Sequence, residues 1–283
     1  MTPISLVDTH VHWWNPALFR YEWLDGLPTL NRAFLPGDYR NASSAAEVGK
    51  MVFVESGCES KQSLAEVDWI CGLAKEEPRL KGIVAHAPVE KGANVRRDLD
   101  ELARRPLVKG VRRSLQDERD SEAFLGPEFI AGVSLLETFG LTFDVCVRHE
   151  QLRAAAELAR RVPNVTFVLD HLGKPNVRDR MTQPWAGDLK AFAALPNTVC
   201  KISGLATEGD WQHWKPAAFK FYYEWALKCF GFHRVLFGGD WPVVTLATSY
   251  QRWLELITGL CASATEAERI KLFRINAERI YRV

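Results

Sequence analysis

The sequence has little of what marks a secreted, membrane-spanning or nucleic-acid-binding protein. Its six cysteines are scattered without a CxxC pair, unlike the framework of a small disulfide-stapled domain. Lys and Arg number 36 against 35 for Asp and Glu, so the formal net charge of +1 favours no polyanionic partner. The sequence shows no apolar run near the roughly 20 residues of a membrane span, and its first residues show no basic targeting segment. We therefore expect a cytoplasmic protein that binds neither nucleic acid nor membrane, with its oligomeric state open.

The length and the order of the segments predict one domain over residues 1–283. A chain of 283 residues with 47% apolar residues can bury a large core, and α/β barrels commonly span about 250 residues. Short β-branched and aromatic segments alternate with amphipathic ones such as 61–76, 150–161 and 214–230, as in βα units around a parallel sheet. Strands are expected at residues 4–9, 51–55, 82–86, 108–113, 142–147, 165–170, 198–203 and 234–239, with a terminal helix around 264–280. The eight strands predict an α/β fold, a (β/α)8 TIM barrel.

Residues 13–42 form an irregular insertion after the first expected strand. The segment is rich in tryptophan and proline, including Trp13, Trp14 and Trp23, and is long for a plain connection. Loops that follow barrel strands cover the catalytic face. The insertion is therefore either a lid or wall over a substrate site, or a packed surface flap, and its sequence favours neither.

Polar residues occur at the ends of three expected strands. His10 and His12 are two apart at the end of the first strand and therefore point to the same side. His171 follows the sixth strand, and Asp240 follows the eighth. Because the carboxyl ends of barrel strands face one mouth, we expect these four side chains to share a site. Imidazoles and a carboxylate could there hold a metal ion or stabilise an oxyanion.

Three motifs at these strand ends carry a resemblance to a known family. They are D-T-H-V-H at 8–12, D-H-L-G-K-P at 170–175 and G-G-D-W-P at 238–242. Together they resemble the amidohydrolase-2 group of the amidohydrolase superfamily, over essentially the whole chain. The segments E-W-L at 22–24 and V-F-V-E at 52–55 are similar to its sugar-lactonase branch, which includes L-fuconolactonase and L-rhamnonolactonase.

The resemblance implies a hydrolase that opens a sugar-acid lactone, of the L-fucono- or L-rhamnono-lactone type, to the aldonate. Asp240 would be the general base, and His10, His12 and His171 would join it in catalysis or as metal ligands. Many members of the superfamily bridge two metals with a carboxylated lysine near the end of strand four, where this chain has Arg112, Arg113 and Ser114. We therefore expect either one divalent cation, with zinc as the first candidate, or no bound metal.

Two other functions stay open at this point. A zinc-dependent nonoxidative decarboxylase of the same group would use similar ligands. A barrel that binds a ligand without turnover is the third alternative, although it would not need a carboxylate facing three imidazoles.

Further polar and aromatic residues near strand ends are candidates for substrate contact: Trp14, Glu55, His86, Arg113, His149 and Trp241. Indole faces suit a sugar ring, and the polar groups could bind its hydroxyls. The alternatives are core packing for the tryptophans and rim salt bridges for Arg113 and His149. Lys201 could form a buried ion pair with Asp144 or Glu55, or serve catalysis, and the role of Arg148 stays open.

Overall fold

Eight parallel strands form a barrel in the computed structural model, which describes residues 4–118 and 120–283. Neighbouring strands pair in chain order from β1 to β8. The strands are β1 (Leu6–Val11), β2 (Val48–Val54), β3 (Leu80–His86), β4 (Val108–Arg112), β5 (Thr142–Val145), β6 (Phe167–Leu169), β7 (Thr198–Ile202) and β8 (Val235–Phe237). Each lies within two or three residues of its predicted position, so the predicted (β/α)8 barrel is confirmed.

The seam between β1 and β8 closes at the carboxyl ends of these strands. Asp240 N donates to the carbonyl of His10 at 2.8 Å, and His12 N donates to the carbonyl of Trp241 at 2.8 Å. Thr9 Oγ1 adds a bond to the carbonyl of Phe237 at 2.6 Å. Because these bonds lie where the motifs occur, barrel closure and placement of His10, His12 and Asp240 depend on the same contacts.

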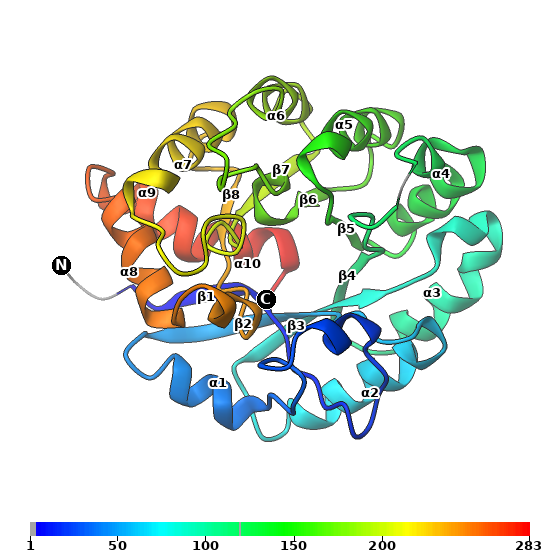
Figure 1. Cartoon of the computed structure of the whole chain (residues 1–283). Coiled ribbons are helices and arrows are strands. Elements are labelled where there is room, and N and C mark those ends of the chain that lie inside the picture. The colour runs from blue at the N-terminus through cyan, green and yellow to red at the C-terminus, as the bar shows by residue number, and fades with distance from the viewer. Residues whose placement is uncertain (1–3, 119) are drawn as a thin grey trace.

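Helices surround the barrel on its outside, apart from α10, which lies over its centre in this view (Figure 1). They are α1 (Pro36–Ala42), α2 (Ser63–Leu73), α3 (Arg96–Ala103), α4 (Pro127–Ser134), α5 (Leu152–Arg161), α6 (Trp185–Ala193), α7 (Ala217–Phe230), α8 (Tyr250–Leu260), α9 (Glu266–Ile270) and α10 (Asn276–Tyr281). The predicted terminal helix is divided: a π-helical turn, Lys271–Ile275, separates α9 from α10. Among the described residues, no helix combines the length and the apolarity that crossing a membrane requires.

The lower half of the barrel interior, toward the amino-terminal ends of the strands, is apolar. Side chains that point inward from the strands fill it, and they form one buried cluster: Val7, Val52, Val54, Val84, Val168, Val199 and Leu236, with Ala277 and Tyr281 of α10. The Asn276 side chain donates to the carbonyls of Val235, the first residue of β8, and of Phe232 in the turn before it. The helix α10 therefore covers the amino-terminal end of the barrel, opposite the seam residues described above.

The segment predicted as an insertion contains a helix of its own. Residues 36–42 form α1, with Pro36 at its first position, where a proline fits because that N–H has no helical partner. Before it, Trp13, Trp14 and Tyr21 are buried in the core. The irregular part is therefore a packed structure, and its relation to the site is described below.

Candidate active site

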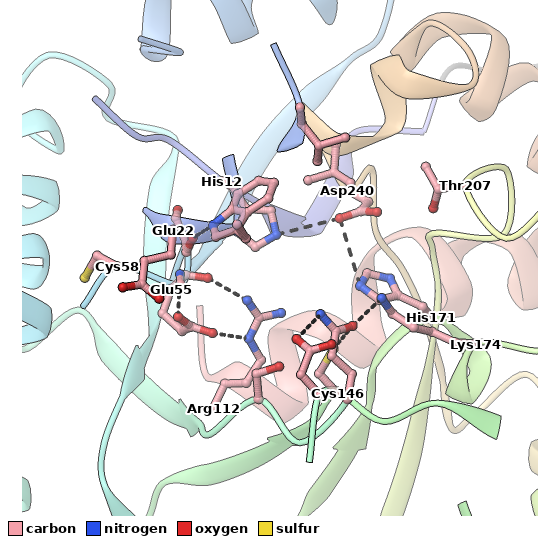
Figure 2. A pocket seen from close by; sticks show the side chains of 18 of the residues that line it. His12, Glu22, Glu55, Cys58, Arg112, Cys146, His171, Lys174, Thr207 and Asp240 are labelled. Atoms are coloured by element: carbon pink, nitrogen blue, oxygen red, sulfur yellow. Dashed lines mark hydrogen bonds and ion pairs between the residues drawn. The ribbon is translucent and has the colours of Figure 1, made fainter. Parts of the chain in front are cut away.

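Four side chains from three strand ends converge at the carboxyl-terminal mouth of the barrel. Asp240 Oδ1 lies 3.7 Å from His10 Nε2, 3.7 Å from His12 Nε2 and 4.0 Å from His171 Nε2. Figure 2 shows His12 and His171 on either side of the Asp240 carboxylate. All four side chains are buried, with Asp240 and the imidazoles of His12 and His171 reaching a cavity. The geometry brings together the four residues that the motifs singled out.

The backbone at two of these positions is in the left-handed region. His171 and Asp240 both have φ of +53°, which costs energy for residues other than glycine and recurs at functional sites. Gly204, at φ +65°, packs against His171 so closely that a Cβ there would lie 2.5 Å from its Nδ1. Ser203 Oγ lies 2.9 Å from the same nitrogen. The sharp turns after β6 and β8 thus aim His171 and Asp240 inward and hold them there.

Burial and the shared carboxylate set the charges of these groups. Burial lowers the pKa of His171 to about 4, although Asp240 and Asp170 favour the imidazolium. Burial likewise holds the pKa of His10 well below its ordinary value. For Asp240, burial acts to raise the pKa, but the facing histidines, His171 first, outweigh it and leave the pKa below its usual range. At neutral pH the imidazoles of His10 and His171 are therefore neutral and the Asp240 carboxylate is ionised.

This donor set fits one divalent cation. His12 Nδ1 lies 2.8 Å from the carbonyl of Val54, an acceptor, so His12 presents a lone pair at Nε2. The Nε2 atoms of His10 and His12 are 3.1 Å apart and each lies 3.7 Å from Asp240 Oδ1. Tetrahedral zinc with bonds of about 2.0–2.1 Å places its ligand atoms about 3.3 Å apart. The three atoms therefore have the spacing of ligands around one such ion.

The other ring nitrogen of His10 lies between two groups of opposite charge. Nδ1 is 3.3 Å from Asp170 Oδ1, which can only accept, and 3.2 Å from Lys201 Nζ, which can only donate. A proton on Nδ1 facing Asp170 would leave Nε2 free for a cation. A hydrogen bond from Lys201 would instead leave the proton on Nε2, directed at His12. The same side chains thus suit a metal-bound and a metal-free site.

Arg112 at the end of β4 belongs to the site, although the sequence did not single it out as a contact residue. Its Nε donates to Glu55 Oε1 at 2.7 Å, and its Nη1 lies 3.2 Å from Asp170 Oδ2 and 3.4 Å from His10 Nε2. A fixed guanidinium therefore occupies the end of β4, beside His10 and Asp170. The sequence contained a signal for this difference. Arg112 is two residues from Gly110 and points inward with it, whereas Arg113 is two residues from Val111 and points outward with it.

A chain of buried charges lies below the histidines. Lys201 Nζ donates to Asp144 Oδ2 at 2.6 Å and lies 3.0 Å from Asp170 Oδ1. Of the two partners proposed for Lys201, the structure thus places it beside Asp144. Asp170 was quoted within a motif but given no role, and its two oxygens link Lys201 and His10 on one side with Arg112 on the other.

The mouth of the barrel opens into a cavity of about 650 Å³. Its wall includes Glu55 and Arg112 from strand ends, and Glu22, Trp23 and Leu27 from the tryptophan-rich segment. Trp23 Nε1 donates to the carbonyl of Ser56 at 2.9 Å, which fixes this segment to the loop after β2. The segment is therefore both a packed element and part of the cavity wall. Figure 2 shows Glu22, Glu55 and Cys58 together on one side, with Lys174 and Thr207 across from them.

Trp14 and Trp241 stand behind the cavity wall, outside the described lining residues. The Trp14 indole donates to the carbonyls of Leu30 and Arg32 and packs against Phe34. Trp241 packs edge-on against Phe34, and both indoles are almost fully buried. Their packing supports the loop that carries Trp23.

The other three candidates for substrate contact also lie outside the described lining residues. His86 borders a separate hollow between α2 and α3. Arg113 points outward and pairs with Glu118 at 2.6 Å. His149 borders a small hollow together with Lys174, and only Lys174 also reaches the main cavity. Of the six candidates, the cavity wall contains Glu55.

Comparisons with known proteins identify the family of the chain. A family model described as "Amidohydrolase" matches residues 7–283. The chain belongs to the amidohydrolase family. It is 32% identical to an L-fucono-1,5-lactonase of Burkholderia multivorans, over 97% of this chain and 95% of that protein. It is 24% identical to an L-rhamnono-gamma-lactonase of Scheffersomyces stipitis, over the full length of both.

Among solved structures, an amidohydrolase from Burkholderia multivorans with bound zinc is similar throughout. It is 30% identical, covers 98% of this chain and 99% of its own, and superposes with a TM-score of 0.90. The bound zinc is a property of that protein.

Proposed function

We propose that this amidohydrolase opens a sugar-acid lactone, of the L-fucono- or L-rhamnono-lactone type, to the aldonate, with Asp240 as the general base. The observation that carries the proposal is an ionised carboxylate held within 4.0 Å of three imidazole nitrogens at the base of a cavity. The names of the two curated relatives supply the substrate class.

The reaction needs one base and one oxyanion site. Asp240 Oδ1 faces the imidazoles, which leaves Oδ2 to accept a proton from water as the water oxygen attacks the lactone carbonyl carbon. The tetrahedral intermediate then collapses, the bond from the carbonyl carbon to the ring oxygen breaks, and Asp240 returns the proton to that oxygen. The products are a free hydroxyl and a carboxylic acid, which ionises.

The electrostatics favour an ester over an amide. A carboxylate with a depressed pKa is a weak base, so the reaction needs either an activated water or a reactive carbonyl with a good leaving group. A lactone supplies an alkoxide leaving group, which departs more easily than an amine. The Arg112 guanidinium at the cavity wall adds positive charge where the carbonyl oxygen becomes negative.

We further propose one zinc ion per chain, held by His10, His12 and Asp240 with His171 facing them. When bound, it would acidify the attacking water and polarise the carbonyl. Glu55 would contact the substrate hydroxyls beside Arg112, and the Trp23 indole would form a flat wall for the sugar ring.

The test is acid release from a panel of aldonolactones, followed with a pH indicator in weak buffer and corrected for hydrolysis without protein. We expect turnover of L-fucono- or L-rhamnono-lactones. Carbon dioxide from a hydroxybenzoate or a muconate semialdehyde, without acid release from any lactone, would establish the decarboxylase instead. Binding of a lactone without either product would establish the third alternative.

Elemental analysis after dialysis tests the metal. We expect at most one zinc per chain, because Arg112 stands beside the first ligand set. A stoichiometry near two would refute this, and full activity after verified zinc removal would select the metal-free form of the site.

A further inference from the structure

A single line of contacts joins the far end of the barrel to the site. Tyr281, the last residue of α10, is fully buried, and its ring lies in the apolar cluster at the amino-terminal end of the barrel. Its hydroxyl donates to Asp144 Oδ2 at 2.6 Å, across 137 positions of sequence. The same oxygen accepts from Lys201 Nζ at 2.6 Å. The ammonium of Lys201 then reaches His10 Nδ1 at 3.2 Å.

The hydroxyl of Tyr281 and the ammonium of Lys201 donate to the same atom, Asp144 Oδ2. Loss of the hydroxyl would therefore change how strongly Asp144 attracts Lys201. Asp144 and Asp170 both attract Lys201, which lies 2.6 Å from the former and 3.0 Å from the latter. In a buried site, a carboxylate that loses one donor attracts its other donors more strongly. Without the Tyr281 hydroxyl, Lys201 would therefore move toward Asp144 and away from Asp170 and His10.

A movement of Lys201 changes what His10 can do. The proton of His10 resides on Nδ1 or Nε2 according to whether Asp170 or Lys201 is the stronger partner at Nδ1, as described above. Partners of the outer ring nitrogen fix the tautomer and orientation of a histidine that binds a metal or a reacting atom. The contact between Tyr281 and Asp144 thus affects whether His10 Nε2, the atom that faces Asp240, carries the proton.

We propose that Tyr281 is a positioning residue for the His10 imidazole, acting from the opposite end of the barrel through Asp144 and Lys201. Its consequence for turnover rests on the proposed function, whereas its consequence for the imidazole does not. Loss of the direct outer partner of a metal-binding histidine costs roughly 10- to 100-fold in metal affinity or activity, so the lower end of that range is expected for Tyr281, which acts through two further side chains.

The experiment replaces Tyr281 with phenylalanine, which keeps the ring in its apolar cluster and removes the hydroxyl alone. Two variants serve as matched controls. Tyr223→Phe alters another buried tyrosine, on α7, at 1% exposure. Thr142→Val removes the hydroxyl that donates to Asp144 at 3.1 Å, but from Oδ1, the oxygen that Lys201 does not share.

Three measurements are made on the full chain. Zinc affinity is measured by competition with a chelator, the His10 tautomer by nitrogen-15 shifts of the imidazoles in zinc-free protein, and kcat and KM with the lactone found above. His10→Gln assigns the imidazole signals. We expect Tyr281→Phe to shift the His10 nitrogens, to weaken zinc binding by about 10-fold and to lower kcat with little change in KM. Tyr223→Phe should leave all three at wild-type values, and Thr142→Val should change them less.

The outcomes separate the two proposals. Wild-type imidazole shifts and zinc affinity in Tyr281→Phe would overturn the positioning role, whatever the substrate proves to be. If the imidazole signals shift in Tyr281→Phe while the wild-type protein hydrolyses no lactone, the positioning role stands and the proposed function is rejected. Should Tyr281→Phe fail to fold, Thr142→Val decides: a small shift of the His10 nitrogens would support coupling through Asp144, and nitrogens at their wild-type positions would overturn it.

Discussion

The two ends of the barrel interior are filled with opposite kinds of side chain. The lower end holds valines, Leu236 and the α10 residues Ala277 and Tyr281, whereas the upper end holds imidazoles and Asp240. Between them lies a layer of buried charges that includes Arg112, Lys201 and Asp170. Burial of apolar surface at the lower end stabilises the fold. The upper layers provide the reactive groups, and burial of their charges costs desolvation free energy. Substitutions at the two ends should therefore separate stability from turnover.

The largest expected effect is on stability, from Arg112→Ala in the charged layer. The substitution leaves Glu55 and Asp170 buried without their guanidinium, so the free energy of unfolding should fall by about 3–5 kcal/mol. Urea denaturation measures it. Arg113→Ala is the control, because that side chain pairs on the outer rim with Glu118 and should cost less than about 1 kcal/mol. Equal losses in the two variants would contradict the importance assigned to the buried layer.

Next in size is the effect of Asp240→Asn on turnover. The amide keeps the shape of the side chain but cannot accept the proton from water, so kcat should fall by a factor of roughly 10² or more while the fold persists. The rate is compared with that of Asp100→Asn, which alters an exposed aspartate on α3. A variant as fast as the wild type would show that Asp240 is not the base.

A smaller effect, opposite in kind, is expected at the lower end from Val84→Ala. Val84 is fully buried in the apolar cluster, so the lost methyl groups and the resulting cavity should lower the free energy of unfolding by about 2 kcal/mol. Because the cluster lies below the charged layer, kcat at room temperature should stay at the wild-type value. A parallel loss of kcat would mean that the upper end depends on packing at the lower end at this position.

Much of this contrast could be predicted from the sequence, because hydrophobic alternation is a local signal. The ends of β1, β6 and β8 placed His10, His171 and Asp240 at one mouth through strand parity and parallel topology alone. Parity would also have selected Arg112 over Arg113. Pro36 at the start of α1 was a signal for a helix within the supposed insertion.

Other parts of the site depend on contacts between segments far apart in the chain. Whether Trp14 or Trp23 faces the cavity is decided by the fold of the loop, where Trp14 is held by the carbonyls of Leu30 and Arg32. The bond from Tyr281 to Asp144 depends on how α10 enters the end of the barrel. Neither contact has a periodic or local signature, so neither could be predicted from spacing.

The last prediction concerns Glu66 on α2, a buried carboxyl below the loop after β2. Burial raises its pKa to about 8, and the charge of Glu55 adds to the shift, while Tyr21 and the Ser56 amide donate to it. Its folded pKa lies above its unfolded value, so its contribution to stability is complete at low pH. That contribution is lost as pH rises from about 4.5, where the unfolded chain ionises, toward about 8.

Glu66→Gln tests this sign, because groups common to both proteins cancel in the difference between them. Near pH 5 the two free energies of unfolding should be similar, since an amide resembles a neutral carboxyl. Near pH 8 the variant should be the more stable by more than about 1.4 kcal/mol, the free energy of one pKa unit. Denaturation at several pH values measures the difference. A difference that is constant with pH would mean that Glu66 is already ionised in the folded protein, and that the apolar surroundings of the loop after β2 do not extend to its carboxyl.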